Sequence, residues 1–259
     1  MGAMMNPALF EGVGVALATI FTEDGGIAVG ETAQLAGRLV AAGVRAVVVA
    51  GSTGEAPALD REERVALLRA VQDAVPDDVP VIVGTGDVTT AGAAGHTRAA
   101  VAAGADAVLV LSPPRVADPR GYYEAVRGAA GAVPVLGYHF PAMSAPGIDL
   151  EILAQLDIDG LKDSSGDAER LLIEAQRFGG ALYTGAAPLL VHARAVGCRG
   201  AILALANIEP EACIAAFGGD AEAQRELLAA HLAIKRDFPH GLKQELHARY
   251  GVSAATRMG

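Results

Sequence analysis

The chain has 259 residues, of which 52% are hydrophobic and 19% charged, so it can bury a large core and does not have the composition of a disordered protein. Its net charge of -10 at pH 7, without a clustered basic stripe, argues against a nucleic-acid partner. Its longest apolar runs are far shorter than the ~20 residues that span a bilayer, so no membrane association is expected. Cys198 and Cys213 are too few for a disulfide framework and are not at metal-site spacing, which favours a cytoplasmic protein without a metal site.

Three passages repeat one another, and each resembles a helix end followed by a strand. They cover residues 41–50, 102–111 and, more loosely, 195–204. Each contains a glycine where a left-handed residue would end the helix, and the apolar run after it is typical of a strand buried on both faces.

Five further short apolar strands are predicted, which brings the number to eight; they cover residues 14–20, 79–84, 134–138, 158–162 and 181–184. Helical patterns occupy the intervening and final segments, among them 60–75, 90–103, 210–217, 221–238 and 241–250. Regular alternation of strand and helix predicts the α/β class and a parallel sheet, and eight such units in about 250 residues favour a closed (β/α)8 TIM barrel.

A Rossmann fold is less well supported, because Gly12-Val-Gly14 lacks the third glycine of the dinucleotide motif. No linker rich in Pro, Gly or Ser divides the chain. We therefore expect a single domain over 1–259, with the barrel at about 12–218 and a short C-terminal helical extension at about 219–259.

Lysine is scarce in this sequence, which has three lysines and seventeen arginines. Lys235 and Lys243 lie in polar helical segments and are expected to be solvated. Lys162 instead follows an apolar strand and precedes a Ser-Ser-Gly turn, which places it at the carboxyl end of a barrel strand, where barrel enzymes keep their sites. Burial there favours the free amine, which attacks carbonyl groups. An ion pair with Asp163, or a Schiff base with pyridoxal phosphate, would use such a lysine equally well.

Tyr138 ends the preceding predicted strand, so its hydroxyl should open into the same mouth of the barrel. A phenol held near an amine can relay the protons that imine formation and C–C cleavage require. The alternative is an amphipathic tyrosine at a strand end.

The segment Gly51-Ser-Thr-Gly-Glu55 follows the second predicted strand. Its glycines allow the backbone to approach a ligand closely, and Ser52 and Thr53 add donors that could hold a carboxylate. The same segment could equally be a turn with a helix cap. The remaining histidines outside the motifs show no metal-ligand spacing and are interpreted as surface or packing residues: His96, His192, His231, His240 and His247.

Four motifs, in this order and spacing, resemble the N-acetylneuraminate lyase and dihydrodipicolinate synthase family of class I aldolases. They are Gly51-Ser-Thr-Gly-Glu55, Tyr138-His-Phe-Pro141, Gly160-Leu-Lys-Asp-Ser-Ser-Gly-Asp167 and Ala206-Asn207. The likeness extends from about Gly12 to Asn207.

The resemblance implies a Schiff-base lyase in which Lys162 attacks the ketone of pyruvate, Tyr138 and Ser52 move protons, and Ser52 and Thr53 hold the carboxylate. It also implies that further residues line the substrate site, namely Gly51, Gly185 and Ile202. The covalent imine on Lys162 would replace any metal or organic cofactor. A homo-oligomer, either a dimer or a dimer of dimers, is implied as well.

The positions that select the second substrate depart from the family pattern. Pro113-Pro114-Arg115 stands where the synthases usually have Pro-Tyr-Tyr, and Met143 stands about where they have an arginine. His139 and Arg115 are our candidates for replacing the lost polar contacts. We expect a lyase that makes or breaks a C–C bond between pyruvate and an aldehyde, with a 4-hydroxy-2-oxo acid type of substrate and diverged specificity. The alternatives are a dihydrodipicolinate synthase, which joins pyruvate to aspartate semialdehyde, and a non-catalytic barrel that binds a 2-oxo acid.

Overall fold

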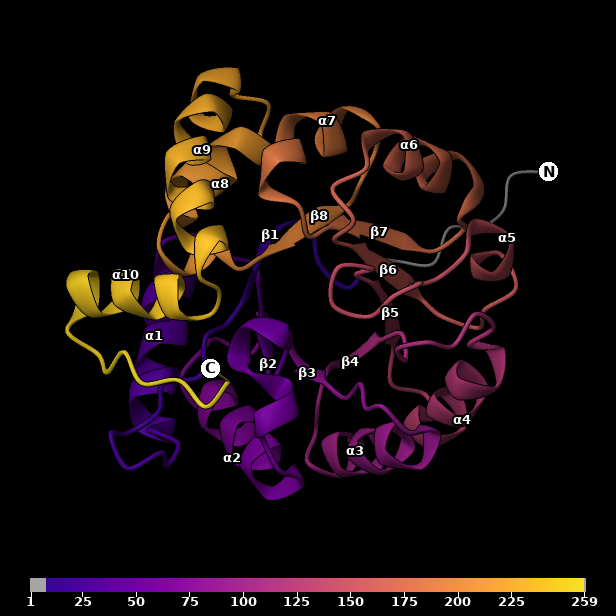
Figure 1. Ribbon diagram of the computed structural model, residues 1–259, viewed down its shortest axis with the longest axis horizontal. Coiled ribbons are helices and arrows are strands. Elements are labelled where there is room, and N and C mark those ends of the chain that lie inside the picture. Colours follow the sequence, from indigo (N-terminus) through magenta and orange to yellow (C-terminus); the bar gives the residue numbers. More distant parts are fainter. Residues whose placement is uncertain (1–7, 259) are drawn as a thin grey trace.

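The structure is a computed structural model that describes residues 8–258. Within these residues, eight parallel strands pair in chain order and close into a barrel, because β1 pairs with both β2 and β8. Helices surround the barrel (Figure 1), which confirms the predicted (β/α)8 fold. The strands are Gly12–Ala16 (β1), Ala46–Val49 (β2), Val81–Gly84 (β3), Ala107–Leu111 (β4), Val135–His139 (β5), Gly160–Asp163 (β6), Ala181–Thr184 (β7) and Gly200–Leu203 (β8).

The outer helices alternate with the strands, and two more helices follow the last of them. They are Val29–Ala41 (α1), Arg61–Gln72 (α2), Thr90–Ala102 (α3), Arg120–Ala130 (α4), Leu150–Leu153 (α5), Ala168–Arg177 (α6), Leu190–Ala195 (α7), Pro210–Phe217 (α8), Ala221–Arg236 (α9) and His240–Tyr250 (α10). Side-chain caps fix several of the starts. Asp60 and Glu63 form a capping box at α2, and Asp167 accepts two backbone N–H bonds at the start of α6.

The observed ends differ from the predicted ends by a few residues, most clearly at β1, which ends at Ala16 rather than at residue 20. The side chain of Asn207 explains the difference. Its Oδ1 accepts the backbone N–H of Ala18 at 3.0 Å, and its Nδ2 donates to the carbonyl of Ala16 at 2.7 Å. Asn207 therefore takes over the backbone groups that a longer strand would have paired.

Side chains alternate between the barrel interior and the layer beneath the helices. The interior set includes Leu109, Leu136, Tyr138 and Ile202. At the amino end of the barrel the rings of Phe10 and Tyr183 stack with their centroids 4.6 Å apart. This packing fills that end and leaves the carboxyl end of the strands for a site. No helix in residues 8–258 is long and apolar enough to cross a membrane.

Lys243 corrects one sequence-based expectation, because it is fully buried rather than solvated. Its Nζ lies 3.3 Å from Oε1 of Glu55 and donates to the carbonyls of Thr19 and Ala255. Burial lowers the pKa of Lys243, and the Glu55 carboxylate opposes that shift. A buried ammonium needs such partners.

Candidate functional site

Lys162 lies at the carboxyl end of β6 and is 5% exposed. It is in register with Tyr138 on β5, and both side chains point to the barrel interior. The Lys162 Nζ lies 4.3 Å from the centroid of the Tyr138 ring. A buried amine is thus covered by the face of the phenol at the mouth of the barrel.

The neighbouring Asp163 does not form an ion pair with Lys162. Alternation along β6 directs it to the outer layer, where Arg170 Nε lies 3.7 Å from its Oδ2 and its Oδ1 accepts the N–H of Ser165. Glu174 completes this buried cluster, with Oε1 2.8 Å from Arg170 Nε. Burial, together with the charge of Asp163, raises the pKa of Glu174 to about 9 in spite of that arginine. Glu174 is therefore protonated at pH 7, and Arg170 balances Asp163.

Glycine at position 185 makes space for the lysine. A Cβ at Gly185 would lie 2.9 Å from Cε of Lys162 and 1.8 Å from Oγ of Ser164. Ile202 on β8 points into the barrel and is fully buried. The structure thus brings Gly185 next to Lys162 and places Ile202 on the interior wall.

The 51–55 loop follows β2 and begins with a 3-10 turn over Ser52–Gly54. Thr19 Oγ1 donates to the Gly54 carbonyl at 3.0 Å, and Glu55 adopts a left-handed conformation with φ of 55°. Thr53 and Glu55 are buried, whereas Ser52 is half-buried. The turn is therefore fixed by contacts on both sides and presents Ser52 to the barrel mouth.

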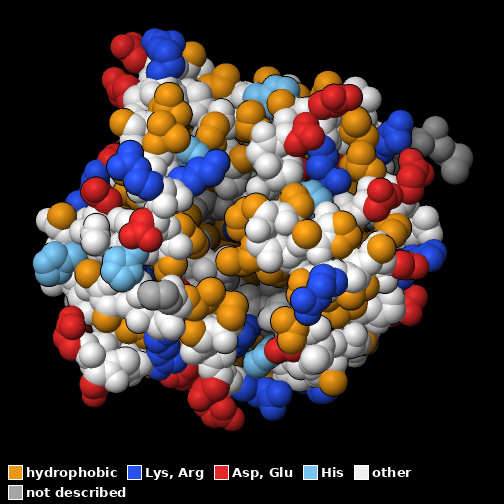
Figure 2. All heavy atoms as spheres, in the orientation of Figure 1, with side chains coloured by type: hydrophobic (Ala, Val, Ile, Leu, Met, Phe, Trp, Pro, Cys, Tyr) orange, Lys and Arg blue, Asp and Glu red, His pale blue; other side chains and the backbone are white. Residues whose placement is uncertain are grey.

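A cavity of about 370 Å³ lies over the carboxyl ends of strands β2 to β5. The face of the molecule drawn in Figure 2 is hollowed near its centre, with hydrophobic side chains around the hollow. Apolar lining residues of the cavity include Pro57, Leu59, Leu109, Leu111, Met143 and Met258. Polar lining residues include Ser52, Arg64, Asp87, His96, Ser112 and Tyr138. Tyr138 lines the cavity and its ring covers the Nζ of Lys162, which is not itself among the lining residues.

Of the sequence-predicted site residues, Gly51, Ser52 and Tyr138 line this cavity. Its lining does not include Lys162, Thr53, Gly185, Ile202, His139 or Arg115. The last two also lie outside the barrel interior. The side chain of His139 belongs to the outer face of β5, where its Nδ1 accepts the N–H of Ile148 at 2.9 Å. Burial and the charge of Arg170 lower the pKa of His139 to about 4, so the ring is neutral at pH 7. Arg115 is exposed, with a φ of 62° and its N–H bonded to the Ala145 carbonyl. Both residues shape the surroundings of the mouth without lining the cavity.

Sequence reasoning missed Arg64 and Met258, which both line the cavity. Arg64 is buried, with its guanidinium donating to the carbonyls of Ala56 and Gly84. The sequence pattern contains one indication that Arg64 is buried. Arg64 lies on the same face of α2 as Leu67 and Leu68, and a charged residue is unusual on the apolar face of a helix. No local pattern marks Met258. No group of three or more His, Cys, Asp or Glu side chains in residues 8–258 is arranged to hold a metal ion.

Comparison with known proteins identifies the family. The sequence pattern of the Dihydrodipicolinate synthetase family matches residues 9–254. The 4-hydroxy-tetrahydrodipicolinate synthase of Salinibacter ruber is 34% identical over 218 residues, which are 80% of this chain and 72% of that protein. An uncharacterised DapA-like lyase of Halobacterium salinarum is 34% identical over 258 residues, 96% of this chain and 84% of that protein.

A solved structure agrees with these sequence matches. YagE, a prophage protein of E. coli K12 from the dihydrodipicolinic acid synthase family, in complex with pyruvate, superimposes with a TM-score of 0.87 at 28% identity. The match covers 96% of this chain and 92% of that one. Fold, sequence pattern and relatives therefore agree with the resemblance of the four motifs: the chain belongs to the dihydrodipicolinate synthetase family and is a lyase.

Proposed function

We propose that this enzyme forms an imine between Lys162 and pyruvate and uses it to make or break a C–C bond with an aldehyde. The observation that carries the proposal is the placement of a buried amine, without a carboxylate partner in the described residues, under the ring of Tyr138 at the carboxyl end of the barrel. YagE, a relative of the same fold, is known in complex with pyruvate.

In the proposed reaction the Lys162 nitrogen attacks C2 of pyruvate, and the resulting carbinolamine loses water to give the imine. Loss of a proton from C3 gives an enamine, whose C3 bonds to the aldehyde carbon while the aldehyde oxygen gains a proton. Hydrolysis then releases a 4-hydroxy-2-oxo acid and the free lysine. Cleavage is the same sequence in reverse. Tyr138 and Ser52 are the groups proposed to carry the protons.

The carboxylate of pyruvate is proposed to lie against the 51–55 loop, with donors from Ser52 and Thr53 and with the backbone of Gly51 close by. Gly185 and Ile202 would complete the pyruvate site. Fixed donors around a carboxylate hold the ketone in reach of the amine without reorganisation during the reaction.

Trapping with borohydride tests the proposal. Reduction in the presence of pyruvate should add one reduced pyruvyl group, and peptide mass spectrometry should locate it on Lys162. Lys162→Arg should abolish the adduct. Lys235→Arg, which changes an exposed lysine on α9, is the matched control and should retain it. An unlabelled wild-type protein, or an adduct on Lys235, would overturn the proposal.

A dihydrodipicolinate synthase is the second candidate, favoured by relatives such as the Salinibacter ruber protein. Met143 lines the cavity about where the resemblance places an arginine, which disfavours an acceptor that carries a carboxylate. The two candidates differ in one assay. Pyruvate with aspartate semialdehyde should give little turnover, whereas uncharged aldehydes should give more.

We further propose that no metal or organic cofactor takes part, that the protein acts in the cytoplasm and that it forms a homo-oligomer, either a dimer or a tetramer. Exposed apolar side chains such as Val88 and Leu228 would be covered in an oligomer. Activity that survives dialysis against a chelator would support the first point. Sedimentation velocity reports the oligomeric state directly.

A further inference from the structure

Residues 251–258 form an extended segment, called here the strap, that follows α10 and lies half-buried over the barrel beside β2 and α2 (Figure 1). Gly251 begins it in a left-handed conformation, with φ of 69°. The strap reaches the mouth of the barrel, and its residue Met258 lines the cavity.

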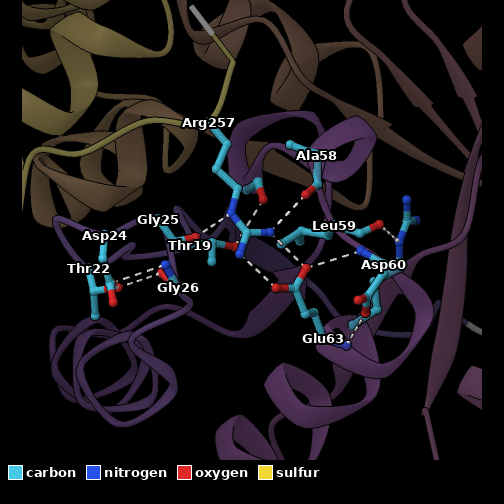
Figure 3. A network of polar contacts seen from close by, with 12 residues as sticks. Thr19, Thr22, Asp24, Gly25, Gly26, Ala58, Leu59, Asp60, Glu63 and Arg257 are labelled. Atoms are coloured by element: carbon cyan, nitrogen blue, oxygen red, sulfur yellow. Dashed lines mark hydrogen bonds and ion pairs between the residues drawn. The ribbon is translucent and has the colours of Figure 1, made fainter.

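Arg257 fastens the strap to α2 and its surroundings (Figure 3). Its guanidinium donates two hydrogen bonds to the Glu63 carboxylate, at 2.8 and 2.7 Å. It also donates to the carbonyls of Gly25 and Ala58, both at 2.8 Å, and lies 4.7 Å from the centroid of the Phe21 ring. A forked, planar donor set of this kind fixes orientation as well as position.

Glu55 joins the strap to the 51–55 loop. The backbone N–H groups of Arg257 and Met258 donate to Glu55 Oε2 at 2.7 and 2.8 Å. The other oxygen of Glu55 forms the buried ion pair with Lys243. One fully buried carboxylate therefore fixes both the end of the loop that carries Ser52 and the backbone of the strap.

We propose that Met258 is a specificity-determining residue that forms an apolar wall of the aldehyde space, and that Arg257 is a positioning residue that sets this wall and, through Glu55, the 51–55 loop. The inference rests on the proposed reaction with pyruvate. Met143 and Pro57 also line this cavity, and the three apolar side chains limit the length of the aldehyde that fits there.

Met258→Ala tests the wall. With pyruvate and a series of straight-chain aldehydes, the variant should raise kcat/KM for the longer members relative to acetaldehyde by about tenfold, the lower end of the discrimination that one methylene group supplies in a hydrophobic pocket. The KM for pyruvate and the borohydride adduct should not change. Val252→Ala trims another apolar side chain of the same strap that is outside the cavity, and should leave the aldehyde profile as in the wild type.

Arg257→Gln tests the positioning role. It should broaden the aldehyde profile as Met258→Ala does and also raise the KM for pyruvate more than it lowers kcat, with partial recovery in Arg257→Lys. Arg120→Gln breaks an exposed pair with Asp118 and should change neither quantity. Hydrogen exchange gives a readout without catalysis, because amides of the 51–55 loop should exchange faster in Arg257→Gln and not in Arg120→Gln.

The outcomes separate the two proposals. A wild-type protein that forms no adduct with pyruvate defeats the proposed reaction, while the exchange experiment still decides whether the strap positions the loop. If the wild type forms the adduct but Met258→Ala leaves the relative kcat/KM values for the aldehydes unchanged, Met258 does not determine specificity. If the amides of the 51–55 loop exchange hydrogen at the same rate in Arg257→Gln as in the wild type, Arg257 does not position that loop.

Discussion

The ring face of Tyr138, rather than its hydroxyl, is the part of that residue that lies over the Lys162 amine, with Nζ 4.3 Å from the ring centroid. The strand register fixes this arrangement, because Tyr138 and Lys162 are direct partners on β5 and β6. Ring and hydroxyl therefore have separable roles. The ring covers the amine, and in the proposed reaction the hydroxyl carries protons.

Tyr138→Phe keeps the ring and removes the hydroxyl that is proposed to relay protons. We expect steady-state turnover to fall by about 10²- to 10⁴-fold, whereas slow trapping of pyruvate by borohydride should persist. Tyr138→Ala removes both roles and should lose the adduct as well. Equal turnover in Tyr138→Phe and the wild type would show that the hydroxyl moves no proton.

Gly185→Ala places a methyl group 1.8 Å from Ser164 Oγ and 2.9 Å from Lys162 Cε. Because the lysine has to shift to accommodate it, adduct formation should slow by about tenfold or more. Single-turnover trapping measures this rate. Gly128→Ala on α4 is the control, since a Cβ there meets no atom within 4 Å. An undiminished rate in Gly185→Ala would mean that this glycine is not required by the lysine.

Lys243→Met leaves the Glu55 carboxylate buried without its cation. Removal of one partner from a buried pair costs about 3–5 kcal/mol, so the free energy of unfolding should fall by that order. The double variant Lys243→Met with Glu55→Gln should be more stable than the single one, because the lone charge is gone. Denaturant titration followed by circular dichroism measures both. Lys235→Met on the surface should change stability little.

Glu174 gives the stability of the fold a pH dependence. Its pKa is about 9 in the folded protein and near 4.5 when the chain is unfolded, so the folded state holds the extra proton between these values. This contribution to stability is complete below pH 4.5 and is lost as the pH rises towards 9, by at most about 1.4 kcal/mol per pH unit. Glu174→Gln should flatten that decline in melting temperature. The exposed Glu151→Gln should keep the wild-type slope.

His139 makes the stability of the folded protein fall as the pH becomes acidic, whereas Glu174 makes it fall as the pH rises. Because its pKa is lowered from 6.5 to about 4, the unfolded chain binds the proton more readily, and stability is lost as the pH falls from 6.5 to 4. The loss is on the order of 3 kcal/mol. His139→Asn should reduce it, as thermal melts at pH 7 and pH 4.5 would show. His192→Asn is the control, and an acid-induced loss that is equal in all three proteins would contradict the assignment.

The barrel and the placement of Lys162 beside Tyr138 could be predicted because both depend on local patterns. Apolar runs after helix-ending glycines mark the strands, and residues at the carboxyl ends of adjacent strands meet in the mouth, which places Lys162 beside Tyr138. The same alternation directs His139 away from the mouth once Tyr138 points inward. The alternation along the strand therefore excludes His139 from the mouth once Tyr138 is placed there.

Other features depend on contacts between distant parts of the chain. Lys243 lies in a helix of polar character, and nothing near it in sequence indicates that it forms a buried ion pair with Glu55. Met258 follows no periodic pattern and reaches the cavity through the contacts of the strap with Glu63 on α2 and with Glu55. Pairings of this kind become visible only when the tertiary structure is known.

Asn207 has a consequence for the order in which the chain folds. Its side chain binds Ala16 and Ala18, which precede it by about 190 residues. β1 also takes its second partner from β8, so one edge of β1 has no neighbour until nearly the whole barrel has been synthesised. Strand edges without neighbours promote aggregation, and contacts this distant in sequence slow folding. During translation, the seam between the first and last strands is where the nascent chain is most exposed to association with other chains.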